Sequence, residues 1–399
     1  MKPFPDLFAD GVHDDTAAIQ ARLDSGMSCV YLPPTPHHYV ISKPLRLGSD
    51  QELKLDRFTR IRLAPHSDCV MLTNRDYEKG NSRCALTGGI WDFDNLNQGP
   101  NFMCQHVLGL PAYKDSPYYR VFLPDRYRAE AIYFQNVSNM TVKGITIRNP
   151  GTYAIQFCKL SYFVIDDVEF DFTTCNPAKA NMDGVHLDGA CHHGKISNIR
   201  GTCYDDMIAL NANDGACTFE EGPITDIDID GVYCEYCHSA VRLLSTGADI
   251  RRVTIRHVHG NFYRYGVGLT HFFRDRKTRG VFDDIVIEDC FMAKARQPED
   301  LWELLPVFPM IYCDDRIDVG KLSIVRLCRD EKTLPEAAIE IMPDCRIGNL
   351  SITDCKQVNR LDVPLTFLWN KGLVDHMEFR NNELVSAPGM NIERKGPKA

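Results

Sequence analysis

Two adjacent aspartates, Asp205 and Asp206, stand directly before a short apolar run in the segment YDDMIALN (204–211). Crowded carboxylates repel each other, and this repulsion, with partial burial, raises one pKa enough to hold a proton near neutral pH. Such a pair can therefore supply an acid and a base to the same reaction. A third carboxylate, Asp183 in NMDG (181–184), precedes Asp205 by 22 residues, and His238 follows in CHSAVRL (237–243).

Paired aspartates alone are weak evidence for a site, because the chain contains five such pairs, at 14–15, 166–167, 205–206, 283–284 and 314–315. Most of them are expected to be solvated turn residues. The case for chemistry at Asp205-Asp206 must therefore come from the elements that place Asp183 and His238 near them.

Those elements form a repeat in which apolar residues occur at positions i, i+2 and i+5. Examples are Met140-Val142-Ile145, Ile227-Ile229-Val232 and Leu350-Ile352-Cys355. Alternation at i and i+2 indicates a strand with one buried face, and the step to i+5 indicates a corner before the next strand. Such short strands bury their faces only by stacking. The sequence therefore predicts an all-β fold, a single-stranded right-handed parallel β-helix of roughly 9–11 coils.

A second strand pattern occurs in most coils, and the residue between its two apolar positions is expected to face solvent. Stacking then builds an outward row from Gln156, His186, Ala209, Arg242 and Gly268. A parallel row two residues further on includes Asn211. The motifs that carry Asp183, Asp205-Asp206 and His238 lie at the edge of this surface, on consecutive coils.

The chain is predicted to form one domain over residues 1–399, because no linker composition interrupts the repeat. The segment DDTAAIQARLDS (14–25) fits a short amphipathic helix, so residues 10–25 are expected to cap the first coil. Two segments without the repeat pattern, 99–128 and 293–310, are expected to be loop excursions near the cleft.

Composition excludes several classes of partner. The net charge is −9 with dispersed Lys and Arg, which disfavours nucleic acid, and no apolar stretch is long enough to span a membrane. The segment MKPFPDLFADGVHDD has no apolar core typical of a signal peptide, so we expect a cytoplasmic protein. The 16 cysteines are then expected to be reduced thiols, and CEYC (234–237) lacks the second half of a zinc motif.

In these motifs and in the repeat, the chain resembles the polygalacturonase family of glycoside hydrolases and its pectin-lyase-like β-helix relatives. The segments DGVHDDTAAIQ, VYLPP and GGIWDFDNLNQ are similar to the N-terminal coils of that superfamily. NMDG resembles the family's Asn-x-Asp-Gly, YDDMIALN its Gly-Asp-Asp motif, and CHSAVRL stands where the family has Gly-His-Gly. The resemblance covers most of the chain at the level of fold and about 65 residues at the level of motifs.

The resemblance implies hydrolysis of a glycosidic bond with inversion at the anomeric carbon. It implies Asp205 as the general acid and Asp183 and Asp206 as the residues that hold the attacking water. His238 would orient the acid through a hydrogen bond, and Asn181 would orient Asp183. No cofactor is implied.

This chain departs from the family pattern at several positions. Tyr204 replaces the Gly before the aspartate pair, and Cys237 and Ser239 replace the two Gly that flank the histidine. The family's Arg-x-Lys, which holds the substrate carboxylate, would fall on Gly268 and Thr270. The catalytic aspartates therefore match while the galacturonate-binding pair does not.

Other side chains around these motifs are candidates for contact with a sugar. They are His186, Arg242, Asn211, Tyr204 and His271. No metal site is predicted, because the adjacent His192 and His193 would point to opposite sides of a strand.

Two other classes of function fit the same fold. A calcium-dependent lyase, an epimerase or an intramolecular glycosyl transferase would use the carboxylates differently, with Arg242 or Arg264 as a base in the lyase. A non-catalytic carbohydrate-binding solenoid would tolerate loss of Asp206. The favoured interpretation is exo-action on imported oligosaccharides of plant type, pectic or related, with neither nucleic acid nor membrane as a partner.

Overall fold

The computed structural model describes residues 4–101, 129–213, 221–271, 277–299, 301, 306–385 and 391–395. Most of the predicted excursion at 99–128 and part of that at 293–310 lie outside the described residues. The described chain is nearly all β-strand, with one α-helix, α1 (Thr16–Asp24), and one 3₁₀ turn, η1 (Asn95–Asn97). No helix in these ranges is long and apolar enough to cross a membrane.

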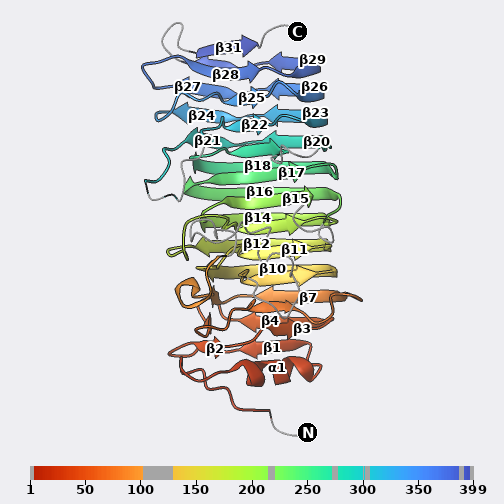
Figure 1. The fold of residues 1–399 in the computed structure, drawn as a ribbon, viewed down its shortest axis with the longest axis vertical. Helices are drawn as coiled ribbons and strands as arrows, with labels where there is room; N and C mark the ends of the chain where they lie inside the picture. Colours follow the sequence, from red (N-terminus) through yellow and green to blue (C-terminus); the bar gives the residue numbers. More distant parts are fainter. Residues whose placement is uncertain are drawn as a thin grey trace. The chain divides into compact units, whose positions relative to one another are not determined.

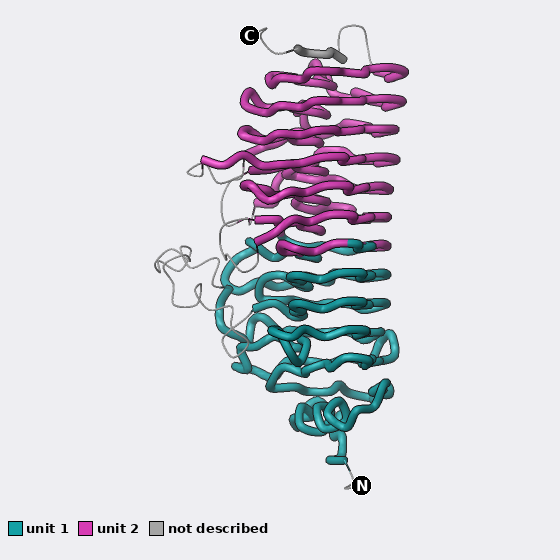
Figure 2. The backbone as a smooth tube through the Cα atoms, turned by 90° about the vertical axis from the view of Figure 1, so that its right-hand side faces the viewer, with its two compact units in different colours: residues 1–186, 193–195, 199–204 teal, residues 187–192, 196–198, 205–399 magenta. Residues whose placement is uncertain are grey.

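The chain divides into two compact units (Figure 2), and each is described by itself. Unit 1 comprises residues 1–186, 193–195 and 199–204, and unit 2 comprises residues 187–192, 196–198 and 205–399. Strands β13 (Val185–Asp188) and β14 (His192–Thr202) contribute residues to both units. The expectation of a single domain stays a prediction.

Unit 1 contains three series of strands that repeat in chain order. The first consists of β1 (Cys29–Leu32), β4 (Gln51–Leu55), β7 (Asn81–Thr87), β10 (Val137–Arg148) and β12 (Ser161–Asp171). The second consists of β2 (Tyr39–Ile41), β5 (Arg60–Leu63) and β8 (Ile90–Asp92). The third consists of β3 (Leu45–Leu47), β6 (Leu72–Asn74), β9 (Ile132–Gln135) and β11 (Ile155–Cys158). Neighbours within each series pair in parallel.

Unit 2 also contains three series of strands that repeat in chain order (Figure 1). The first consists of β16 (Ile224–Cys237), β18 (Asp249–Phe262), β20 (Gly280–Glu288), β23 (Ile317–Val325), β26 (Cys345–Thr353) and β29 (Leu373–Arg380). The second consists of β21 (Phe291–Lys294), β24 (Cys328–Glu331), β27 (Lys356–Asn359) and β30 (Glu383–Val385). The third consists of β15 (Asp206–Asn213), β17 (Ser239–Ser245), β19 (Val267–Thr270), β22 (Ile311–Cys313), β25 (Ile339–Ile341), β28 (Leu365–Asn370) and β31 (Asn391–Lys395). Their pairing is again parallel.

These stacked parallel strands confirm the predicted parallel β-helix. The predicted i, i+2 and i+5 residues point into the core, as in β16, where Ile227, Ile229 and Val232 are buried. The third series contains 12 described strands, so the coils slightly outnumber the roughly nine to eleven predicted.

The corner between i+2 and i+5 is made by one residue in the left-handed conformation at i+4. This residue is Gly144, Asp167, Asn198, Gly231, His257, Asp289, Arg326 or Asp354, each with φ between 53° and 90°. Gly, Asn and Asp adopt this conformation more readily than other residues do. Its recurrence turns the chain at the same place in each coil, which explains why the apolar spacing repeats.

One expectation about the predicted outward row is wrong. Gln156 and His186 are each 1% exposed, and Arg242 is largely buried. The row exists as predicted in unit 2, since Ala209 pairs with Arg242 and Arg242 with Gly268. Aromatic side chains cover two members of this row: the Tyr153 ring stacks on His186, and the Tyr265 ring lies against Gly268.

The predicted cap is observed as α1, whose buried residues include Ile19 and Leu23. The aspartate pair before it is structural. Asp14 accepts a hydrogen bond from the backbone N–H of Thr16, and buried Asp15 accepts from several backbone N–H groups. Asp14 therefore contacts the first residue of the helix, whereas Asp15 joins the segment before the helix to β2.

The cysteines of CEYC depart from the expectation of reduced thiols. Cys234 and Cys237 form a disulfide, with Cα atoms 6.1 Å apart. The pairing of β16 with β18 shifts register between these two residues, so both side chains point inward while Tyr236 is exposed. The bulge thus brings the two sulfurs together, one residue before His238.

Candidate functional site

The site in unit 2 lies at the starts of two neighbouring parallel strands. Asp206 begins β15 and Ser239 begins β17, and these two residues are partners in register. Asp205 and His238 are the residues directly before them. Because the strands are parallel and in register, their preceding residues come together at the same edge of the sheet. The structure thus brings His238 to the aspartate pair, as the sequence predicted.

His238 is surrounded by polar groups on both ring nitrogens. Its Nδ1 lies 3.1 Å from Asp205 Oδ1 and 2.8 Å from Ser239 Oγ. Its Nε2 lies 3.3 Å from Nη1 of Arg264. The Tyr263 ring contacts the imidazole edge to face, at 5.3 Å between centroids. The ring is therefore held in one orientation, with a carboxylate on one side and a guanidinium on the other.

The pKa of His238 is well below the ordinary value for histidine. Burial is the largest cause, because the charged imidazolium loses its hydration, and nearby Arg264 disfavours a second positive charge. Asp206 acts in the opposite direction without reversing the shift. His238 is therefore neutral near pH 7.

Asp206 is fully buried beside a guanidinium. Arg242 Nε lies 2.9 Å from Asp206 Oδ2, and His238 Nδ1 lies 4.0 Å from Asp206 Oδ1. Neither carboxylate oxygen accepts a hydrogen bond of ordinary geometry from the described residues. Arg242, one of the predicted substrate-contacting residues, is thus also the charge partner of a predicted catalytic carboxylate.

The three groups Asp205, Asp206 and His238 also have the spacing of metal ligands, since their ligand atoms lie within 4.8 Å of one another. The charges around them argue against a metal ion. Arg242 contacts one carboxylate and Arg264 contacts the histidine, so a divalent cation would meet two fixed positive charges. The donor set therefore fits proton transfer better than metal binding.

Unit 1 holds the third predicted carboxylate. Asp183 is fully buried, and its Oδ2 lies 2.6 Å from Nδ1 of His186. The His186 ring stacks on Tyr153, with centroids 3.9 Å apart and planes 13° from parallel. Asn181 adopts the left-handed conformation, with φ of 50°, two residues before Asp183. His186 thus orients Asp183, a contact that the sequence did not predict.

Tyr204 has a structural contact in the same unit. Its hydroxyl donates to the backbone carbonyl of Phe172 at 2.9 Å, and Lys179 Nζ lies 5.2 Å from the centre of its ring. Tyr204 stands where the family has a glycine. Because its hydroxyl is hydrogen-bonded to Phe172, Tyr204 fixes the position of the residue directly before the aspartate pair. Its contact with a sugar stays a prediction.

The remaining predicted residues lie in buried surroundings. Asn211 is 3% exposed within β15. His271 is fully buried, with Nε2 2.7 Å from the carbonyl oxygen of Thr278, and its backbone N–H donates to Asp314. Thr270 donates its hydroxyl to the carbonyl of Leu243. These bonds hold the coil together at the positions after Gly268.

A side chain at position 268 is excluded by Tyr265. A methyl group on Gly268 would lie 2.8 Å from Cε2 and 2.9 Å from Cζ of the Tyr265 ring, closer than carbon atoms pack. Burial and nearby Asp206 raise the pKa of the Tyr265 hydroxyl, so this ring is neutral. The departure from the family's Arg-x-Lys therefore has a physical cause, since an aromatic ring fills the space.

Sequence reasoning missed two residues of the site and assigned a third a different role. Ser239 replaces a family glycine, and that departure was the signal that could have indicated its contact with His238. Tyr265 gave no comparable signal, because it lies outside every motif. Arg264 entered the sequence analysis only as a base for a lyase, whereas the structure places it against His238.

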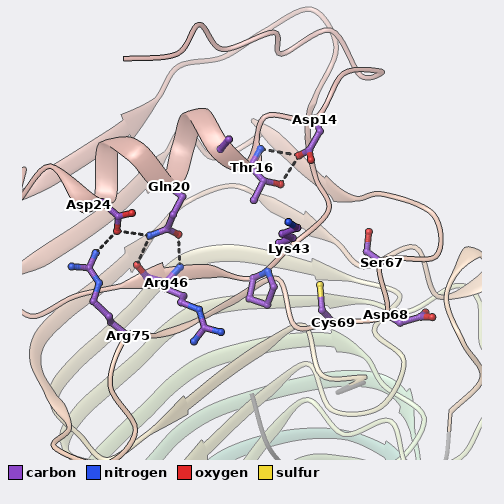
Figure 3. Close-up of a pocket in the computed structure, with 12 residues that line it drawn as sticks. Asp14, Thr16, Gln20, Asp24, Lys43, Arg46, Ser67, Asp68, Cys69 and Arg75 are labelled. Atoms are coloured by element: carbon purple, nitrogen blue, oxygen red, sulfur yellow. Dashed lines mark hydrogen bonds and ion pairs between the residues drawn. The ribbon is translucent and has the colours of Figure 1, made fainter. Parts of the chain in front are cut away.

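An open pocket of about 760 Å³ lies beside α1 in unit 1 (Figure 3). Several of its polar groups hydrogen-bond one another: Asp24 accepts from Gln20 and Arg75, and Asp14 accepts from the backbone N–H of Thr16. Groups that satisfy one another in this way are typical of a structural cap. The pocket holds none of the predicted catalytic residues.

Comparisons with known proteins give a consistent result. Residues 123–240, which include NMDG, YDDMIALN and the start of CHSAVRL with His238, match the model of glycosyl hydrolases family 28. An exopolygalacturonase of family 28 from Yersinia enterocolitica has a similar fold, with 17% identity, a TM-score of 0.65, and coverage of 98% of this chain and 76% of that chain. No curated protein matches. The resemblance to polygalacturonase-like proteins is thereby confirmed in the motif region and in the fold.

The same fold also occurs in proteins with other titles. The A-module of the mannuronan C-5 epimerase AlgE6 from Azotobacter vinelandii has 11% identity, a TM-score of 0.59 and 98% coverage of both chains. The surface protein and adhesin PfbA of Streptococcus pneumoniae has 14% identity, a TM-score of 0.57, and coverage of 98% of this chain and 97% of that chain. At these identities the likeness concerns the fold, and function must come from the site.

Proposed function

We propose that this protein is an inverting glycoside hydrolase that uses a cluster of aspartates as general acid and base. The observation that carries the proposal is the contact of His238 with Asp205 beside the buried Asp206. These residues lie in the segment that matches family 28. The sequence match, together with the contacts among these side chains, supports hydrolysis over a purely structural role.

In the proposed reaction Asp205 donates its proton to the glycosidic oxygen as the bond to the anomeric carbon breaks. A water molecule attacks that carbon from the opposite face and gives its proton to Asp206. The products are a free leaving-group hydroxyl and a new reducing sugar with inverted configuration. Arg242 contacts Asp206, so it stabilises the ionised carboxylate that accepts a proton from water.

The proposed substrate is a short oligosaccharide of pectic or related type, cleaved from one end. Gly268 and Thr270 provide no cation where the family pattern has Arg-x-Lys, so the sugar at that position need not be galacturonate. Exo-action is part of this proposal, and the lengths of the products test it. A cytoplasmic location is also part of it, and cell fractionation tests that location.

The test is a time course by proton NMR on a panel of pectic and other plant oligosaccharides. Asp206→Asn removes the proposed base, and Asp284→Asn is the matched control. Asp284 belongs to another aspartate pair, is about half exposed and pairs with Lys321. We expect the wild type and the control to release a reducing sugar first seen as the inverted anomer. We expect Asp206→Asn to be slower by roughly 10²-fold or more.

Other products would change the assignment. A vinylic proton signal would indicate a lyase, and a uronate inverted at C5 without chain cleavage would indicate an epimerase. A retained anomer would contradict the proposed inversion. Absence of turnover on every member of the panel, with binding retained, would favour the non-catalytic alternative.

A further inference from the structure

Arg264 contacts His238 on the side of the ring opposite to the aspartates. Its Nη1 lies 3.3 Å from His238 Nε2. A guanidinium carries only donors and stays charged in proteins, so the nitrogen it contacts must offer a lone pair. Because His238 is neutral, its single ring proton then lies on Nδ1. The groups near Nδ1 are Asp205 Oδ1 and Ser239 Oγ, and both can accept that proton.

Arg264 is held in this position from three directions. Its backbone N–H donates to the carbonyl oxygen of His238 at 2.9 Å, and its own carbonyl accepts from Lys294 Nζ. The guanidinium lies near the rings of Tyr265 and Phe308, at 5.5 Å and 5.1 Å from their centres. Contacts from both the backbone and the side chain therefore hold the guanidinium in place against His238.

The charged groups that face His238 come from every neighbouring element. The negative groups are Asp205, directly before β15, and Asp206, the first residue of β15. The positive groups are Arg242 on β17, Arg264 after β18, and Lys294 at the end of β21. The positive groups together with burial outweigh the aspartates and lower the pKa of His238. An imidazolium here would hold Asp205 in its ionised form, which cannot donate a proton.

We propose that Arg264 is a positioning residue that fixes His238 as the neutral Nδ1–H tautomer and so directs that N–H at Asp205. The inference rests on the proposed function in taking Asp205 as the acid. With Oδ1 accepting from His238, Asp205 keeps Oδ2 for the proton that it transfers. Lys294 supports the arrangement by holding the Arg264 backbone.

The experiment is ¹⁵N NMR of protein labelled at histidine, recorded from pH 5 to pH 8 without substrate. His238→Asn assigns the signals. In the wild type we expect a protonated Nδ1 and an unprotonated Nε2 throughout this range. Arg264→Met removes both charge and donor, so we expect an imidazolium to form within this pH range and the neutral form to become a mixture of tautomers. Arg264→Lys keeps the charge and should restore the neutral ring.

Two further variants separate positioning from folding. Arg251→Gln is the matched control, because it removes an exposed arginine that pairs with Asp249, and it should leave the His238 signals unchanged. Lys294→Met keeps the Arg264 side chain but releases its backbone, and it should produce part of the Arg264→Met effect. Both are compared with the wild type for native circular dichroism.

The outcomes are distinct from those of the activity test. A wild-type His238 with its proton on Nε2, or an imidazolium at pH 6, would overturn the inference, as would Arg264→Met with wild-type signals in a folded protein. A folded protein that turns over no sugar would refute the proposed function. The NMR measurement needs no substrate, so it would still test whether Arg264 fixes the tautomer of His238. If the protein is active, Arg264→Met should lower kcat by roughly tenfold or more and move the acidic limb of the pH profile.

Discussion

Lys294 is a buried lysine. Its replacement by an apolar residue should stabilise the protein but disturb the position of Arg264 beside His238. The side chain is 1% exposed, and burial, followed by the nearby Arg329 charge, lowers its pKa from 10.5 to about 7. Each pKa unit is worth about 1.4 kcal/mol, so carrying this lysine into the fold costs about 5 kcal/mol at neutral pH. Lys294→Met removes that cost and preserves most of the apolar stem.

The same substitution removes the hydrogen bond from Lys294 Nζ to the carbonyl of Arg264. A buried carbonyl left without a donor costs about 1–3 kcal/mol. The net expectation at pH 7 is therefore a variant more stable than the wild type by roughly 2–4 kcal/mol. Urea unfolding followed by circular dichroism measures the difference.

The pH dependence gives the sharper test. Between about pH 7 and pH 10.5 the unfolded wild type binds one more proton at this lysine than the folded state does. Wild-type stability therefore rises with pH across this window by about 1.4 kcal/mol per pH unit from this residue, and below pH 7 the cost is fully present. Methionine has no such dependence, so the advantage of the variant should shrink from pH 7.5 to pH 9.5. Parallel stability curves for the two proteins would refute the reasoning.

Two further predictions concern departures from the family motifs. Gly268→Ala should destabilise the protein by roughly 1–3 kcal/mol because the methyl group meets the Tyr265 ring. In a Tyr265→Ala background, which is itself less stable because of the cavity, the same substitution should cost much less, and thermal denaturation of the wild type, the two single variants and the double variant measures this difference. Tyr204→Phe should cost about 1 kcal/mol, since it loses one hydroxyl hydrogen bond, and should leave kcat within about twofold; a larger loss of kcat at unchanged stability would show that the hydroxyl serves the reaction.

The fold could be predicted from the sequence because its information is local and periodic. Ile227, Ile229 and Val232 define a strand and a corner by spacing alone, and the same spacing recurs in coil after coil. The corner residue itself varies from Gly231 to Arg326, so composition at that position did not reveal the left-handed turn. The left-handed conformation at the corner therefore follows from the position of the residue in the repeat and not from its type.

The site could be predicted only in part, because alternation along a strand says which way a side chain points and nothing about what covers it. His186 was expected to face solvent, yet Tyr153 stacks on it from outside its own strand. Arg264 lies two residues after the end of β18, where no periodic pattern holds, so the sequence could not indicate its contact with His238. His238 lies between β16 and β17 and was placed because it belongs to a motif at a fixed distance from a strand, whereas Arg264 belongs to no motif.

The aspartate pairs show how the surroundings of a structural carboxylate differ from those of the proposed base. Asp15 and Asp206 are both fully buried. Asp15 accepts backbone N–H bonds from Phe8, Ala9 and Val40, which replace the water it lost. Asp206 accepts no such bond from the described residues and has instead a guanidinium at 2.9 Å. The oxygens of Asp15 already accept hydrogen bonds from the backbone, so they are not available to a water molecule. The oxygens of Asp206 can still accept a hydrogen bond from water. That spare capacity distinguishes Asp206 from the buried Asp15, and it is what a base that activates water requires.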